Sequence, residues 1–167
     1  LGSIIYFTGG ILVDHGWLRI LGSGSAELNR NIIEWNKNKS IHKLGEKPSY
    51  FLVADDILGG LFALNGGAFG KTTIGNIYYY PPDDLKWNDL EINYSQFLNF
   101  CFYGNLDEFY KGMRWPDWGN EIASFNGSDA FLISPFLWSE ESKHNILNCT
   151  RKKVTIQELW DLNFKTH

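Results

Sequence analysis

Two pairs of adjacent residues supply the side chains that could carry out acid–base catalysis in this sequence. Asp14 and His15 place a carboxylate beside a histidine within an alternating apolar block, and histidine is the most frequent general base. Asp55 and Asp56 end an apolar run, and a carboxylate pair can divide into an ionised base and a protonated acid when burial raises one pKa. Such side chains would suit a hydrolase that acts on a sugar or an amide.

Local geometry gives both pairs a second interpretation. Adjacent residues of a strand point to opposite faces of the sheet, so Asp55 and Asp56 share a cleft only where the strand breaks. In the alternative, they belong to a turn, and their carboxylates accept hydrogen bonds from backbone N–H groups. No Ser or Cys in an elbow-type motif accompanies His15, so the sequence does not reveal a nucleophilic triad.

Aromatic residues form the candidate binding surface. Arg114, Trp115 and Trp118 surround a proline, and tryptophan and arginine are enriched at binding interfaces. Trp17 and Tyr79 extend this set, because alternation along the tyrosine run turns Tyr79 away from its two neighbours. Trp115 and Trp118 can also be interpreted as core residues at the start of a helix. A small-ligand or carbohydrate-binding module would use the same two tryptophans.

Metal and cofactor sites are not indicated by any motif. The sequence has no H-x-x-x-H, no C-x-x-C and no alternating Asp loop. Its paired glycines, at 59–60 and 66–67, lack the G-x-G-x-x-G pattern of a phosphate cradle and indicate tight turns. The two cysteines, Cys101 and Cys149, lie far apart, which favours free thiols in a reducing, cytoplasmic compartment. We therefore expect no metal and no cofactor.

Composition limits the remaining possibilities. The chain has 167 residues, 44% of them hydrophobic and 20% charged, which is typical of a globular protein that forms one domain over residues 1–167. A net charge of −4 argues against a nucleic-acid-binding face, and no apolar run reaches the length of about 20 residues that a membrane helix needs. Aromatic residues make up 16% of the chain, more than one core consumes, so a protein partner is expected.

Three short apolar runs in the middle of the chain are expected to position these side chains. Tyr50–Ala54, Leu61–Leu64 and Ile77–Tyr80 are separated by Gly, Asn and Asp residues, which predicts three consecutive antiparallel strands joined by turns. The runs at 4–8, 11–13 and 17–21 are expected to be further strands. Residues 83–90 are interpreted as a turn, and 130–133 as a late strand.

Helices are expected after residue 93. Apolar residues then recur at helical spacing, and Asn93 with Gln96 resembles a capping box. Further helix starts are predicted at Asn105, at Trp115 with its following proline, and at Thr155. Strands followed by helices predict an α+β fold, in which a curved, mainly antiparallel sheet has helices packed on one side.

Six sequence blocks carry a resemblance over nearly the whole chain. They read TGGILVDHGWLRILGSG (8–24), EWN (34–36), LVADDILGGLFALNGGAFG (52–70), IYYYPPDDLKW (77–87), FYKGMRWPDW (109–118) and PFLW (135–138). In this order they resemble the bacterial domain-of-unknown-function family 2625, whose members have no established activity. Members of that family begin with an additional, largely helical segment. Since this chain starts at Leu1 without Met, we expect it to lack that segment.

A second resemblance rests on Asn65-Gly66-Gly67. This turn is similar to one that joins helix and strand elements in the SUKH superfamily of bacterial immunity and interaction proteins. The resemblance implies a SUKH-like α+β arrangement and an immunity-type role with a toxin as partner. The function expected from the sequence is therefore a non-enzymatic, protein-binding domain, with a hydrolase or a ligand-binding module as the alternatives.

Overall fold

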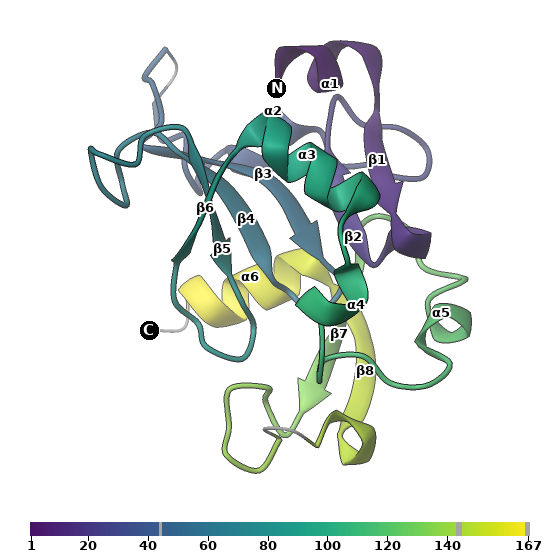
Figure 1. Cartoon of the computed structure of the whole chain (residues 1–167). Helices are drawn as coiled ribbons and strands as arrows, with labels where there is room; N and C mark the ends of the chain where they lie inside the picture. Colours follow the sequence, from purple (N-terminus) through teal and green to yellow (C-terminus); the bar gives the residue numbers. More distant parts are fainter. Residues whose placement is uncertain (44, 143–144, 166–167) are drawn as a thin grey trace.

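A six-stranded antiparallel sheet forms the centre of the chain (Figure 1). The computed structural model describes residues 1–43, 45–142 and 145–165. Each strand pairs with the next one along the chain, so the sheet is a meander with open edges at its first and last strands. The α+β class, the mainly antiparallel sheet and the three central strands are confirmed. The strands are β1 (Gly10–Val13), β2 (Leu18–Leu21), β3 (Tyr50–Asp56), β4 (Leu61–Asn65), β5 (Asn76–Tyr80) and β6 (Asn88–Asn93).

The connection between β4 and β5 shows why turn residues interrupt the apolar runs. The side-chain amide of Asn65 donates to the carbonyl oxygens of Gly70 (2.8 Å) and Thr73 (3.0 Å). Its oxygen accepts from the backbone N–H groups of Gly67 (2.8 Å) and Phe69 (3.2 Å). Gly67 has a φ of 126°, which glycine adopts without steric cost. The Asn-Gly-Gly segment therefore fixes a turn.

Helices cover both faces of the sheet. Phe62 on β4 stacks on Tyr79 of β5 at 4.4 Å and packs against Phe97 of α3 (Tyr94–Tyr103) at 5.0 Å. On the other face, Tyr80 packs at 5.0 Å against Phe164 of α6 (Ile156–Phe164), in a cluster that α2 (Ile32–Asn36) joins. The sequence pattern predicted helices on one side only. The central strands are apolar at consecutive positions, so both of their faces require cover.

The C-terminal part of the chain adds a hairpin of β7 (Asp129–Ser134) and β8 (Thr150–Thr155), which forms a separate two-stranded sheet. The late strand is thus confirmed in β7. β8 was not predicted, and β6 lies partly in the predicted turn at 83–90. The short remaining elements are α1 (Gly2–Phe7), η1 (Asp14–Gly16), α4 (Leu106–Phe109), α5 (Trp118–Glu121) and η2 (Ile146–Asn148).

Two element predictions need correction. The run at 4–8 was predicted as a strand, but residues 2–7 form α1. A strand needs a neighbour to pair its backbone, whereas a helix pairs its own N–H and C=O groups, as in the bonds from the Ile5 N–H to the Leu1 carbonyl and from the Thr8 N–H to the Ile4 carbonyl (both 3.1 Å). The helix expected to start at Trp115 begins at Trp118, because Asp117 adopts a left-handed φ of 70° before it.

The predicted capping boxes are present at both long helices. The Asn93 side chain accepts from the backbone N–H of Gln96 (3.0 Å), while the Gln96 side chain accepts from the backbone N–H of Asn93 (2.9 Å). Thr155 and Glu158 make the same reciprocal bonds at the start of α6. These bonds satisfy N–H groups that an uncapped helix leaves without partners.

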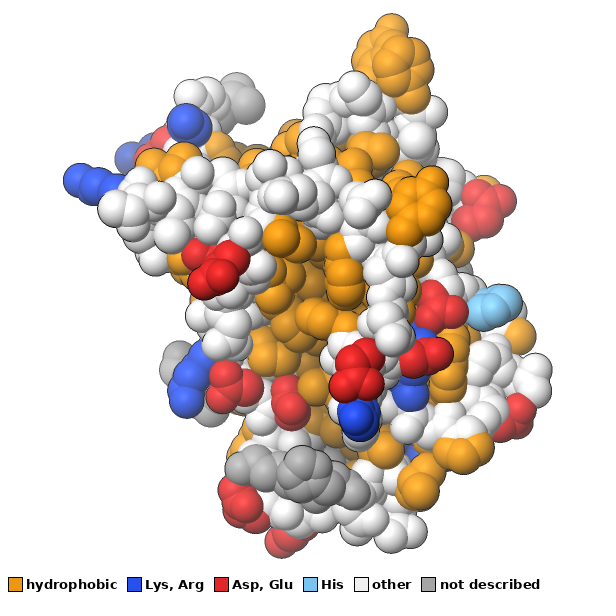
Figure 2. All heavy atoms as spheres, viewed as in Figure 1, with side chains coloured by type: hydrophobic (Ala, Val, Ile, Leu, Met, Phe, Trp, Pro, Cys, Tyr) orange, Lys and Arg blue, Asp and Glu red, His pale blue; other side chains and the backbone are white. Residues whose placement is uncertain are grey.

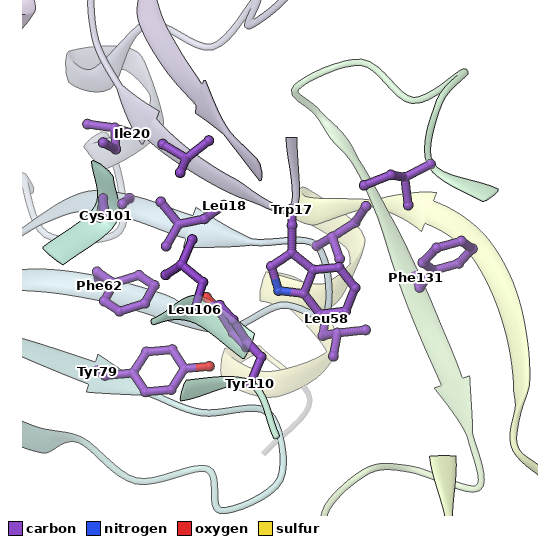
Figure 3. Packing of buried hydrophobic residues seen from close by; sticks show 14 of the residues in the cluster. Trp17, Leu18, Ile20, Leu58, Phe62, Tyr79, Cys101, Leu106, Tyr110 and Phe131 are labelled. Atoms are coloured by element: carbon purple, nitrogen blue, oxygen red, sulfur yellow. The ribbon is translucent and has the colours of Figure 1, made fainter. Parts of the chain in front are cut away.

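One aromatic cluster links the sheet to the hairpin (Figure 3). Trp17, which is fully buried, packs edge-on against Tyr110 at 5.5 Å and lies 5.8 Å from Trp115. Trp115 in turn packs against Phe131 of β7 at 5.5 Å. Segments from the start, the middle and the end of the chain therefore share one core.

Candidate functional site

Candidate residues from two distant parts of the sequence meet in one hollow of about 570 Å³. Asp14 and His15 come from η1, Asp107 from the start of α4, Arg114 from the loop before α5, and Trp118 from α5 itself. We call this cavity the Arg114 hollow. Its lining is completed by Val13, Cys101, Phe102, Gly104, Asn105 and Leu106.

The guanidinium of Arg114 organises the hollow. It donates to the carboxylates of Asp14 (2.5 Å) and Asp107 (2.6 Å). Its carbon lies 4.7 Å from the ring centroid of Trp17 and 4.5 Å from that of Trp118, within the range of cation–π attraction. Only 11% of the Arg114 side chain is exposed. The arginine is therefore held in place by two carboxylates and two indole rings.

Three non-glycine residues beside the hollow have backbone conformations that are rare for residues with a side chain. Asp14 and His15 have φ values of 50° and 58°, and Asp117 has 70°. Non-glycine residues in this left-handed region are uncommon and cluster at functional sites. The turn closes with a hydrogen bond from the Trp17 N–H to the Asp14 carbonyl (3.0 Å). It directs Trp17 into the core while Asp14 and His15 line the hollow.

The arrangement limits what Asp14 and His15 can do together. The Asp14 carboxylate is engaged in its ion pair with Arg114. The exposed His15 ring lies 6.2 Å from the ring of Trp118 in an edge-on arrangement. Asp14, Asp107 and Arg114 together carry one net negative charge. The hollow can therefore accept a polar or cationic group beside an aromatic ring.

Asp55 lies outside this hollow and is fully buried. It accepts hydrogen bonds from Arg19 (2.6 Å) and Arg30 (3.0 Å), and a second contact with Arg30 is shorter still. The two guanidiniums also donate to backbone carbonyls of Asp129 and Gly127 beside the hairpin. Burial alone would raise the pKa of Asp55, but the charges and hydrogen bonds of both arginines outweigh it and hold the pKa low.

Asp56 is also fully buried, and its partners lie elsewhere. Its carboxyl group accepts from the Tyr79 hydroxyl (2.8 Å), the Tyr110 hydroxyl (3.3 Å) and the backbone N–H groups of Leu58 (2.9 Å) and Gly60 (2.8 Å). Burial raises the pKa of this carboxyl group, although these hydrogen bonds oppose the change. The hydrogen bonds from the backbone N–H groups to Asp56 are those expected if this carboxylate belongs to a turn. The structure therefore does not bring the two central acids together with Asp14 and His15 in one cleft.

Three of the five predicted binding residues are buried in the core. Trp17, Tyr79 and Trp115 are exposed by 0%, 7% and 3%. The Trp115 indole donates to Glu121 (2.8 Å), and the guanidinium of Arg151 covers its ring at 4.6 Å. Trp115 is therefore a core residue, which was one of the two interpretations that its sequence position allowed. Of these three, Trp17 contacts the Arg114 hollow, with its ring 4.7 Å from the Arg114 guanidinium carbon and 5.0 Å from the Trp118 ring. Arg114 and Trp118 line the hollow.

A second concave site was not predicted from the sequence. Figure 2 shows hydrophobic side chains gathered in a central hollow of the surface, with acidic side chains at its left and lower margins and basic side chains beside them at the lower margin. The site lies between β6, α3 and α4 and has a volume of about 440 Å³; we call it the β6–α4 groove. Apolar residues on more than one side of α3 were the available signal. The groove is lined by Leu90, Ile92, Gln96, Asn99, Phe100, Tyr103, Gly104 and Phe109.

The described residues contain neither a membrane-spanning helix nor a cluster of metal ligands. None of their helices combines the length and the apolar character that crossing a membrane requires. Within residues 1–43, 45–142 and 145–165, no group of three or more His, Cys, Asp and Glu side chains is arranged to hold a metal ion.

Comparison with known proteins places the chain in a family. The family model described as "Protein of unknown function DUF2625" matches residues 1–159. An uncharacterized protein of Haemophilus influenzae is 44% identical over 164 residues, which cover 98% of this chain and 71% of the relative. The putative uncharacterized protein YbfG of Escherichia coli K12 is 39% identical over 167 residues, covering 99% and 72%. No solved structure matches the chain. The family predicted from the sequence blocks is confirmed, and the chain belongs to DUF2625.

Proposed function

We propose that this chain is a protein-binding domain and that the β6–α4 groove is its contact surface. The observation that carries the proposal is an apolar groove of about 440 Å³ on the surface of the described chain. Exposed apolar patches that are rimmed by polar residues mark interaction sites in folded proteins. Tyr103 on the groove lining is 83% exposed, and tyrosine is among the residues that dominate binding energy.

The charge around the groove indicates what the partner presents. Glu91 lies between the lining residues Leu90 and Ile92. Glu108, which precedes the lining residue Phe109, pairs with Lys111 at 3.3 Å in an exposed ion pair. The whole chain carries a net charge of −4. Complementary potentials steer association and exclude unsuitable partners. We therefore propose a partner segment with apolar side chains for the groove and Lys or Arg residues for its margin.

Selection from a displayed library of random peptides tests this proposal. We expect the selected peptides to combine Leu or Phe with Lys or Arg, and to bind less tightly as salt concentration rises. Tyr103→Ser should weaken binding about tenfold or more, as expected when an aromatic anchor is removed. Tyr6→Ser is a matched control, because Tyr6 lies on α1 and is 81% exposed. Selected peptides that bind Tyr103→Ser as tightly as the wild type would refute the proposal, and so would a selection that enriches no peptide.

An immunity-type role is the finer form of this proposal. A basic toxin would satisfy the apolar and charge requirements of the groove, and burial of its active surface would neutralise it. The role predicts a toxin gene next to the gene for this chain. Expression of that neighbour should arrest growth, and co-expression of the wild-type chain should restore it, whereas co-expression of Tyr103→Ser should not.

The Arg114 hollow supports a second candidate, a small-ligand or carbohydrate-binding function. The supporting observation is that Asp14, Asp107 and Arg114 meet beside the Trp118 ring although they come from distant segments. Sugars are bound by polar side chains next to an aromatic ring. Titration of tryptophan fluorescence with a glycan panel tests this function. A response lost in Trp118→Leu and kept in Trp138→Leu, whose ring is 46% exposed elsewhere, would support it.

Hydrolysis at the same hollow would depend on His15, because Asp55 and Asp56 are buried in other contacts. Hydrolysis of sugar or amide substrates that disappears in His15→Gln and persists in His42→Gln would support this alternative over binding alone. A purified chain that hydrolyses none of these substrates, while the selected peptides bind the groove, would favour the protein-binding function.

A further inference from the structure

Lys39 lies in a pocket between α2 and α6 that is separate from both sites described above. The pocket has a volume of about 380 Å³ and shares no lining residue with the Arg114 hollow or the β6–α4 groove. Ammonium groups and side-chain amides dominate its surface. It is lined by Glu34, Lys37, Asn38, Lys39, Gln157, Trp160 and Lys165.

The Lys39 side chain is held in a defined position. Its Nζ atom lies 3.9 Å from the ring centroid of Trp35 and 5.4 Å from that of Trp160. It donates a hydrogen bond to the side-chain oxygen of Gln157 (2.9 Å). The backbone is fixed as well, because the Lys39 carbonyl accepts from the Tyr50 hydroxyl (3.0 Å). The amine is thus positioned at the pocket wall by two rings and an amide.

Other lysines of the chain have a different environment. Lys37 pairs with Glu34 at 2.6 Å, Lys86 with Asp84 at 3.6 Å, and both lysine side chains are more than half exposed. Both ammonium groups thus have a carboxylate partner, whereas an amine must be unprotonated to act as a nucleophile. Lys39 donates to a neutral amide oxygen.

The surroundings of Lys39 also change its protonation. Partial burial lowers the pKa of its ammonium to about 8, and the positive charges of Lys165 and Arg30 act in the same direction, while Asp161 opposes them. The indole rings attract the ammonium form of Lys39. The nucleophilic reactivity of its amine therefore increases by less than the lowered pKa alone would give. A larger fraction of Lys39 than of an ordinary lysine is nevertheless unprotonated near neutral pH.

We propose that Lys39 is the preferred acylation site of this chain and that its pocket accepts a small acyl phosphate. The unprotonated Nζ attacks the acyl carbon, a C–N bond forms, and the C–O bond to phosphate breaks. Phosphate leaves with the electron pair of that bond, and the proton lost from nitrogen passes to phosphate or solvent. Lys37 and Lys165 line the pocket and supply ammonium groups for the phosphate. Each now pairs with a carboxylate of its own helix region, Glu34 at 2.6 Å and Asp161 at 2.8 Å, in exposed ion pairs that contribute about 0–1 kcal/mol and that a phosphate can replace.

Site-resolved mass spectrometry after incubation with acetyl phosphate tests the proposal. At pH 7.5 we expect Lys39 to be acetylated about tenfold faster than the exposed Lys86, given the difference in free-amine fraction. The rate at Lys39 should rise with pH through a midpoint near its pKa of about 8. A Lys39 rate equal to or lower than that of Lys86 would overturn the proposal.

A variant comparison separates the phosphate contact from amine reactivity. Lys37→Ala should slow acetylation of Lys39 by acetyl phosphate severalfold and leave the rate with uncharged N-acetylimidazole unchanged. Lys86→Ala is the matched control, because Lys86 also pairs with a carboxylate on the surface. If Lys37→Ala and Lys86→Ala give the same Lys39 rate with acetyl phosphate, the pocket does not hold the phosphate group, and that part of the proposal is refuted.

Discussion

Replacement of Asp55 by Asn is the sharpest test of how this fold is held together. Asp55 is fully buried between Arg19 and Arg30, which are exposed by 1% and 9%. The substitution keeps the size of the side chain but leaves two buried guanidiniums without a counter-charge, and its amide N–H₂ group faces one of them. Breaking a buried ion pair by removing one partner costs about 3–5 kcal/mol. For a chain of this length, that loss lowers the melting temperature by about 6–20 °C.

Urea unfolding followed by circular dichroism, together with thermal melting, measures this loss. Asp84→Asn serves as the control, because Asp84 forms an exposed ion pair with Lys86 and such pairs contribute about 0–1 kcal/mol. The double variant Asp55→Asn/Arg30→Met removes one of the stranded charges. The decrease in unfolding free energy for the double variant should therefore be smaller than the sum of the decreases for the two single variants. A loss below about 1 kcal/mol for Asp55→Asn would refute the reasoning.

Three further predictions follow from buried groups. The folded-state pKa of Asp55 is lowered. Its contribution to the free energy of unfolding is therefore complete above the unfolded carboxyl pKa of about 3.9 and is lost as pH falls through the lower folded pKa. The difference in unfolding free energy between wild type and Asp55→Asn should narrow only below about pH 4. Burial raises the pKa of the Cys101 thiol to about 12, so iodoacetamide at pH 8 should label Cys101 in urea but not in the folded protein, as measured by mass spectrometry. Gly60→Ala should cost about 3 kcal/mol or more in urea unfolding, because an added Cβ would lie 2.0 Å from the Asp56 carboxylate.

The parts of the fold that the sequence predicted well are those with strong local signals. Asn93 and Thr155 mark helix starts through capping boxes that their own short segments complete. The central strands were recognisable because Gly and Asn interrupt apolar runs at turns, as at Asn65. In each case a few neighbouring residues determine the structure, so no information about distant contacts is needed.

Elements at the margins of the fold were missed because their signals are weak. β6 and β8 expose many of their side chains, and an edge strand that faces solvent lacks a continuous apolar pattern. Residues 2–7 have the composition of a strand but form a helix in which no residue is buried. Their conformation depends on which backbone partners are within reach, and the sequence pattern does not contain that information.

In the candidate site, too, individual residues were predictable from the sequence, whereas their contacts with distant residues were not. Asp14, His15, Arg114 and Trp118 were each identified from the sequence, but nothing in their spacing indicated that they would meet in one hollow. The buried arginine pair around Asp55 was not anticipated either. The hollow forms where η1 meets α4 and α5, and the arginine contacts form where the sheet meets the C-terminal hairpin. A single sequence does not reveal long-range contacts of this kind.

The arginine bonds between the sheet and the hairpin also constrain the order of events during synthesis. Arg19 and Arg30 emerge from the ribosome long before Gly127 and Asp129, whose carbonyl oxygens they require. A nascent chain that ends earlier offers the two arginines the Asp55 carboxylate and the Asp56 carbonyl, which accepts from Arg19 at 3.1 Å, but it lacks the Gly127 and Asp129 acceptors. We therefore infer that the meander acquires its full stability only after the hairpin residues have been translated, and that a truncated chain is a substrate for proteases.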